Sequence, residues 1–290
     1  MDLQHRYVHA DAGVHPQHAV ARCAARVLAA AGACVLSVTP AAAQLSVEVS
    51  PLRVEIQTEA GGARTQAVSL TNTGKDAVRV RATISDWRLS RDGAPQFEAP
   101  EEGRAYSASG WIRLAPPEIV LEPGAQGAVR FSLSVPPGAG AAGYRTGILF
   151  DFSPAAGDPS ARAREVTFRS RIATLIYVNV GQPPAAVELT DLRIRTTPEQ
   201  TQIVGTLANT SRRTVRTKGS LVITGAAGVA VREVQVPDVP VLPESEREVV
   251  VVALDRAASP LPPGEYRVEL KIDVGLPTLL VGETTLKVAK

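Results

Sequence analysis

The stretch EVTFRSRIATLIYVNV, Glu165 to Val180, sets an apolar side chain at most alternate positions, including Val166, Phe168, Ile172 and Ile176. A period of two predicts a β-strand, and this one runs longer than most. A strand keeps such a face only if something buries it. The partner is the protein's own core, another protein, or both in turn.

The same kind of pattern fills the chain from Leu45 onward. Short alternating runs rich in valine are separated by glycine, proline and other turn residues, and no segment keeps helical spacing over three turns. Regularly spaced strands of this kind predict an all-β fold of the sandwich or barrel type.

A weak internal duplication divides this β-rich region. After GQPPAA, Gly181 to Ala186, a similar order of features begins again. The matched positions are Asn72 with Asn209, Pro123 with Pro243, and Tyr144 with Tyr266. We therefore predict two tandem immunoglobulin-like β-sandwich domains, residues 44–181 and a smaller one at 187–290.

The first residues predict a secretory signal peptide. Three arginines, Arg6, Arg22 and Arg26, lead into the apolar run VLAAAGACVLSV and the small-residue site AAA before Gln44. The run is short for a membrane span. We expect residues 1–43 to be removed by cleavage after Ala43.

Removing this leader changes the chemistry that the chain can perform. Both cysteines, all four histidines and the only methionine lie in it, so the mature chain has none of these residues. That composition argues against a cysteine nucleophile, Ser-His-Asp chemistry, zinc bound by imidazole or thiolate, and disulfides.

The charge balance is close to neutral. Without the leader's three arginines and two aspartates, the basic and acidic counts fall from 31 and 29 to 28 and 27. A balance near zero gives no electrostatic argument for a nucleic-acid partner. We predict a non-enzymatic protein with no cofactor and no metal site.

Three features allow other interpretations. GAGAAG, Gly138 to Gly143, matches a dinucleotide fingerprint, but prolines precede it and a strand pattern follows, so we interpret it as a loop. Trp87 and Trp111 suit core packing better than a sugar platform. A carbohydrate-active enzyme would require paired carboxylates in a cleft, which the sequence alone cannot locate.

The segment SPAAGDPSARAR, Ser153 to Arg164, joins two predicted strands. Its small and polar residues predict an exposed, mobile loop that leads directly into the long alternating strand. Proteins that lend a strand to a partner often have this arrangement.

Several of these runs resemble the N-terminal domain of the PapD-like periplasmic pilus chaperones. The resemblance covers roughly Leu45 to Val180, and its more specific parts are SPLRVEI and PPEIVLEPGAQGAVRF. It implies two immunoglobulin-like domains, a periplasmic location, and binding of a secreted pilin-like client by strand donation. An outer-membrane usher is a further partner that it implies.

The resemblance also implies client-binding residues. Arg53 matches the basic residue that grips the client's terminal carboxylate, and Val166, Phe168, Ile172 and Ile176 match the donor positions. The family's lysine, expected near Ile172 to Thr174, is missing, with Arg171 adjacent. Its acidic residue on the preceding strand is replaced by Arg145-Thr146-Gly147.

The leading hypothesis is therefore a periplasmic chaperone or assembly factor that pairs its long strand with a client. The alternative is a non-catalytic structural or adhesive surface protein of tandem modules. PPGEYRVELKIDVG, in the second half, is equally similar to the tandem domains of WxL-interacting surface proteins.

Overall fold

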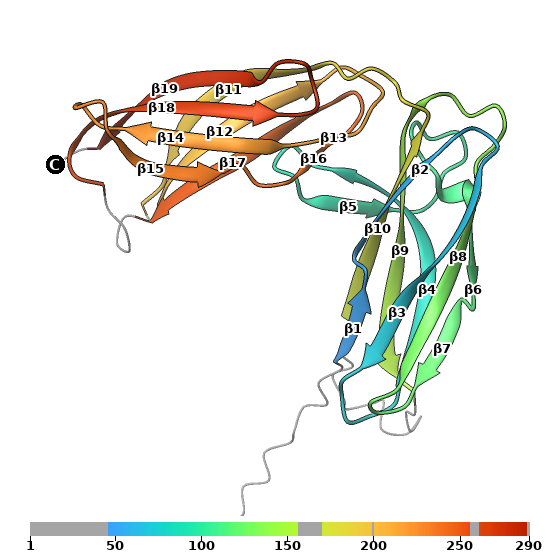
Figure 1. Ribbon diagram of the computed structural model, residues 1–290. Coiled ribbons are helices and arrows are strands. Elements are labelled where there is room, and N and C mark those ends of the chain that lie inside the picture. Colours follow the sequence, from blue (N-terminus) through green and yellow to red (C-terminus); the bar gives the residue numbers. More distant parts are fainter. Residues whose placement is uncertain (1–45, 156–169, 199, 256–260, 289–290) are drawn as a thin grey trace, which may run out of the picture. The chain divides into compact units, whose positions relative to one another are not determined.

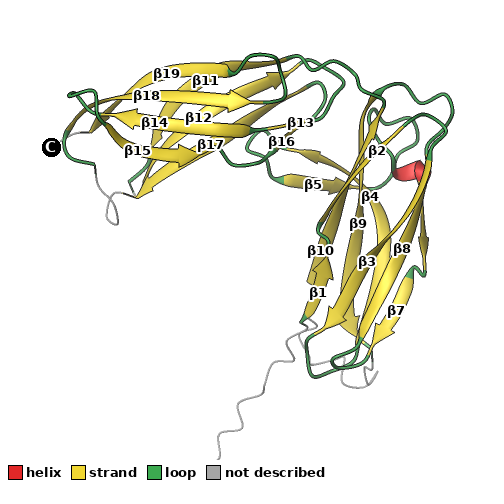
Figure 2. Cartoon of the chain, in the orientation of Figure 1, coloured by secondary structure: helices red, strands yellow, loops and turns green. Residues whose placement is uncertain are grey.

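The computed structural model describes residues 46–155, 170–198, 200–255 and 261–288. They form strands almost throughout, with one short 3-10 helix (Figures 1 and 2). The predicted signal peptide and its cleavage site lie outside the described residues. Among those described, no helix has the length and hydropathy that crossing a membrane requires.

The first half of the described chain is a sandwich of two sheets. Its elements are β1 (Val47–Ser50), β2 (Arg53–Thr58), β3 (Ala63–Asn72), β4 (Val78–Leu89), β5 (Pro95–Glu98), η1 (Ser109–Trp111), β6 (Ile112–Ala115), β7 (Glu118–Leu121), β8 (Gln126–Ser134), β9 (Ala142–Pro154) and β10 (Ser170–Val180). One sheet has the order β1-β3-β8-β6, and the other has the order β2-β10-β9-β4-β5, with β7 also paired to β4.

The second half is also a sandwich of two sheets, and each has fewer strands than its counterpart in the first half. Its elements are β11 (Val187–Thr196), β12 (Gln200–Asn209), β13 (Val215–Arg216), β14 (Lys218–Thr224), β15 (Ala230–Gln235), β16 (Pro240–Val241), β17 (Ser245–Asp255), β18 (Gly264–Asp273) and β19 (Leu280–Val288). The sheets have the orders β11-β12-β17 and β15-β14-β18-β19, with β13 and β16 as a small pair.

Alternating burial explains why these segments form strands. Along β2, RVEIQT, exposed and buried residues alternate without exception, and β8 does nearly the same. The buried sets of facing sheets meet in two separate apolar cores, one in each half of the chain. Valine, isoleucine and phenylalanine fill these interiors because branched and aromatic side chains suit a half-buried pleated surface.

The duplicated asparagines have the same structural role in both halves. The Nδ2 group of Asn72 donates to the carbonyl of Asp76 at 2.8 Å, and that of Asn209 donates to the carbonyl of Arg213 at 2.8 Å. Each asparagine is buried, and each side-chain oxygen accepts the backbone N–H two residues on. The matched asparagines therefore hold corresponding turns in the two halves.

The duplicated tyrosines also correspond. Tyr144 donates its hydroxyl to the carbonyl of Gly140 at 3.0 Å, and Tyr266 donates to the carbonyl of Pro262 at 2.7 Å. A tyrosine bonded to backbone a few residues upstream is the tyrosine corner of immunoglobulin-like sandwiches. The all-β prediction of tandem sandwiches is confirmed.

Candidate functional site

One side of β10 is only partly covered by another strand. On one side β9 pairs with β10 along its full length, whereas on the other β2 pairs with it only from Leu175 to Val180. The first β2-side bond is donated by the Leu175 N–H to the carbonyl of Leu52 at 2.9 Å. Within the described part of the chain, residues 170–174 of β10 therefore pair with no strand on this side.

This part of β10 is unpaired on that side because the first strand of the described chain, β1, belongs to the opposite sheet. β1 pairs with β3, and only after Pro51 does the chain join β10 as β2. Since Leu175 directs its backbone toward β2, alternation directs the N–H and C=O groups of Ala173 and Arg171 to the same side. We call this part of β10, residues 170–174, the open edge.

The predicted client residues divide into three groups by location. Val166 and Phe168 lie outside the described residues. Ile172 lies on the open edge and is half-buried against the first core. Arg53, the first residue of β2, lies opposite Leu175, where the open edge ends.

Ile176 is buried inside the first sandwich and is not exposed to a client. It is 0% exposed and belongs to the first core. β2 and β9 pair with β10 on either side of it. The assignment of Ile176 as a client contact is corrected, because its side chain is enclosed by the protein's own sandwich.

The arginine predicted to replace the family's lysine is bound by a neighbour. The Nε group of Arg171 donates to Asp151 at 2.7 Å, and the Arg171 side chain remains 59% exposed. This carboxylate raises the pKa of Arg171. Nearby, Thr174 is fully buried and its hydroxyl donates to the carbonyl of Pro51 at 2.9 Å, so no basic side chain takes that place.

Arg53 takes part in an ion-pair network that sequence reasoning missed. Its guanidinium lies 3.4 Å from Glu55 and 3.5 Å from Asp238, and its side chain is 50% exposed. Arg216 lies 3.4 Å from Glu55 and 2.6 Å from Asp238. The hydrogen bond from Arg216 is the main cause that lowers the pKa of Asp238.

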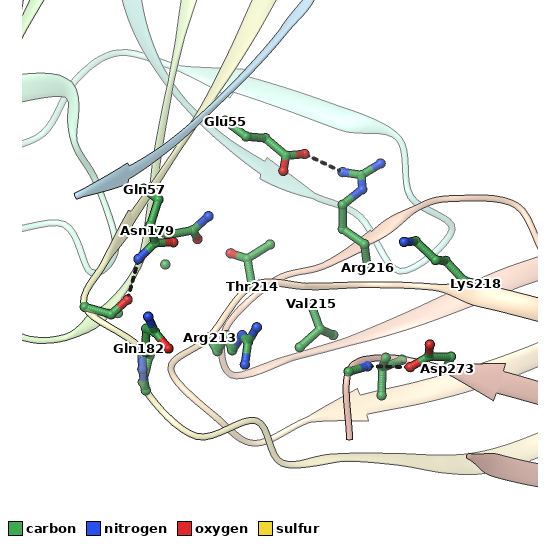
Figure 3. A pocket seen from close by; sticks show the side chains of 16 residues that line it. Glu55, Gln57, Asn179, Gln182, Arg213, Thr214, Val215, Arg216, Lys218 and Asp273 are labelled. Carbon is green, nitrogen blue, oxygen red and sulfur yellow. Dashed lines mark hydrogen bonds and ion pairs between the residues drawn. The ribbon is translucent and has the colours of Figure 1, made fainter. Parts of the chain in front are cut away.

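A polar pocket of about 560 Å³ adjoins this network. Figure 3 shows Gln57, Asn179 and Thr214 around it, with Glu55 paired to Arg216 across one side. None of the predicted client residues that the structure describes lines it. Its two carboxylates already have partners, since Asp273 accepts the N–H of Gly275 at 2.8 Å.

Other candidate motifs have structural roles. Trp87 is buried and donates its indole N–H to the carbonyl of Thr146 at 2.8 Å, and Trp111 packs against the first core. The expectation of core packing is confirmed for both. The GAGAAG segment leads into strand β9 rather than a helix, as predicted.

Arg145 stands where the resemblance leads one to expect an acidic side chain. Its Nε group donates to the carbonyl of Trp87 at 2.9 Å, and its guanidinium lies 5.9 Å from the centre of the Trp87 ring. Burial lowers the pKa of Arg145. Arg145 therefore links β9 to β4 and does not supply the acidic group that the resemblance implies at this position.

No family model matches the chain, and no curated protein matches it. Solved structures do. The class 5 fimbriae chaperone CfaA is 12% identical, covers 82% of this chain and 99% of its own, and gives a TM-score of 0.44. The SafA pilin complex with the SafB chaperone of Salmonella enterica is 13% identical, covering 84% of this chain and 97% of that one, with a TM-score of 0.41.

A third match is the CsuC–CsuE chaperone–tip adhesion subunit pre-assembly complex of Acinetobacter baumannii. It is 16% identical, covers 70% of this chain and 89% of that one, and gives a TM-score of 0.39. Each of these three structures includes a chaperone. Similarity at this level identifies neither a client nor a binding residue of this chain.

Proposed function

We propose that this chain is a non-enzymatic periplasmic chaperone or assembly factor that binds a pilin-like or other envelope client by strand pairing. The observation that carries the proposal is the open edge of β10. Its outward backbone groups, at Arg171 and Ala173, pair with no strand of the described chain. An unpaired strand edge is a template for an added strand.

The side chains around the open edge suit this role. Ile172 is half-buried on the core side, and Leu52, where β2 departs, is 54% exposed. Each backbone bond to an added strand contributes about 1 kcal/mol net, and full burial of a large apolar side chain about 1.5–3 kcal/mol. Two or three such contacts give a weak complex, which further pairing would strengthen.

The proposal also includes Val166, Phe168 and Arg53 as residues that contact the client. Val166 and Phe168 would extend the pairing upstream of Ser170. Arg53 would meet the end of a client strand that runs along β10 toward Leu175, because β2 occupies the edge beyond that point. The proposal also includes export directed by the leader. It further includes an outer-membrane usher as a second partner.

A photocrosslinking amino acid at position 171 tests the proposal in the cells that make this protein. We expect it to capture an exported envelope protein, whereas the same group at Val231, which is exposed on the second sandwich, should not capture it. Ala173→Pro should abolish the crosslink, because it removes an outward N–H without removing a bond to β9.

Thr174→Pro is the matched comparison, since its N–H faces β9 and its loss should destabilise the first sandwich. No capture at position 171, or equal capture at 171 and 231, would contradict strand pairing. Equal capture would instead favour the structural or adhesive alternative.

A further inference from the structure

A row of alternating charges crosses the outer face of the sheet and ends at the open edge. The register places Glu118 of β7 opposite Arg81 of β4, Arg81 opposite Asp151 of β9, and Asp151 opposite Arg171 of β10. The order is acidic, basic, acidic, basic. Directly opposite residues of neighbouring strands point to the same face, so these four side chains are neighbours in one row.

The next row is uncharged. Ala173, Leu149 and Thr83 lie opposite one another on β10, β9 and β4. Leu149 is buried although it belongs to the outer face. The open edge therefore presents a cation in one row and a small apolar side chain in the next.

Arg171 can accept a second acidic neighbour. Its Nε group is occupied by Asp151, but a guanidinium has five N–H donors, and the side chain is 59% exposed. A strand added at the open edge would lie about 4.8 Å from β10 and about 10 Å from β9. An acidic residue there would be close to Arg171 and separated from Asp151 by that cation.

We propose that the open edge selects a client strand carrying an acidic residue opposite Arg171 and an apolar residue opposite Ala173. This specificity rests on the proposed strand pairing and names the chemistry of the partner. A client lysine opposite Arg171 would place two cations side by side, which disfavours pairing.

Two synthetic strand peptides test the proposal. Both alternate threonine and valine, both are acetylated and amidated, and they differ only in a central glutamate or lysine. We expect wild-type protein to bind the glutamate peptide about two- to fivefold more tightly. Arg171→Glu should reverse this preference, as measured by titration calorimetry or NMR.

Arg64→Glu is the matched control. It makes the same charge change at an exposed position of β3, in the opposite sheet, and should keep the wild-type preference. Thermal unfolding of both variants checks that they are folded.

The outcomes separate this inference from the proposed function. Equal binding of the two peptides by the wild type, or a preference that Arg171→Glu leaves unchanged, overturns the acidic specificity while strand pairing stands. If neither peptide binds the wild type, strand pairing fails and the specificity fails with it.

Discussion

Leu175 donates its backbone N–H to the carbonyl of Leu52 at 2.9 Å, and this bond divides β10 into two parts. Beyond it, β10 is an interior strand with neighbours on both sides. Before it, β10 has β9 on one side and an open edge on the other. The two parts share one alternating sequence but differ in what covers them.

This division predicts different effects at two isoleucines of the same strand. Ile176→Ala should lower the free energy of unfolding by about 2–5 kcal/mol, because it leaves a cavity in the first core. Ile172→Ala should cost less, since its side chain is only half-buried, and should weaken client binding. Urea unfolding of both variants measures the difference, and equal losses would contradict the division.

The sequence predicted the features that depend on local pattern. Alternation identified the strands, and the repeated asparagine and tyrosine positions predicted tandem sandwiches. Each of these side chains has a hydrogen bond to backbone a few positions away. Features that depend on pairing between distant segments could not be predicted in this way.

The open edge is one such feature. Period two assigns Ile172 and Ile176 to the same face, but only the point at which β2 joins β10 determines which of them is enclosed. Asp238 is another, because nothing in the local sequence indicates that it lies beside Arg53. Only the register shows that the half-buried Ile172 lies on the open edge and that the exposed Leu52 lies where this edge ends.

A second prediction concerns the turn between β4 and β5. Gly93 has a φ of +90°, and a Cβ atom there would lie 2.4 Å from Nη2 of Arg247. The Arg247 guanidinium also donates to the carbonyl of Pro240, so it can move aside only by giving up that bond. Gly93→Ala should therefore cost the strain of a positive φ plus about 1 kcal/mol for the displaced arginine.

Gly228→Ala is the control, because it adds the strain of a positive φ without a contact to an arginine. Gly228 also has a positive φ, +75°, but a Cβ atom there would meet nothing within 4 Å. Urea unfolding should show a larger loss of stability for Gly93→Ala than for Gly228→Ala. Equal losses would mean that the contact with Arg247 contributes nothing to stability.

The third prediction concerns pH and the Asp238 carboxylate. The hydrogen bond from Arg216 lowers its pKa below the ordinary 3.8 in the folded protein. The unfolded chain therefore takes up this proton first as the pH falls. The stabilisation is complete above the ordinary pKa and is lost as the pH falls through the lower, folded-state value.

Urea unfolding of the wild type and of Asp238→Asn, from about pH 6 to about pH 2, measures this stabilisation as the difference between the two proteins. The wild type should be more stable at the upper end, and the difference should shrink below pH 3.8. Arg216→Gln should remove most of the same difference, because it removes the donor that holds the carboxylate. Asp76→Asn makes the same substitution at an exposed position in the β3–β4 turn and is the control for the change of side chain. A difference that stays constant across the range would show that Asp238 contributes through packing rather than through its charge.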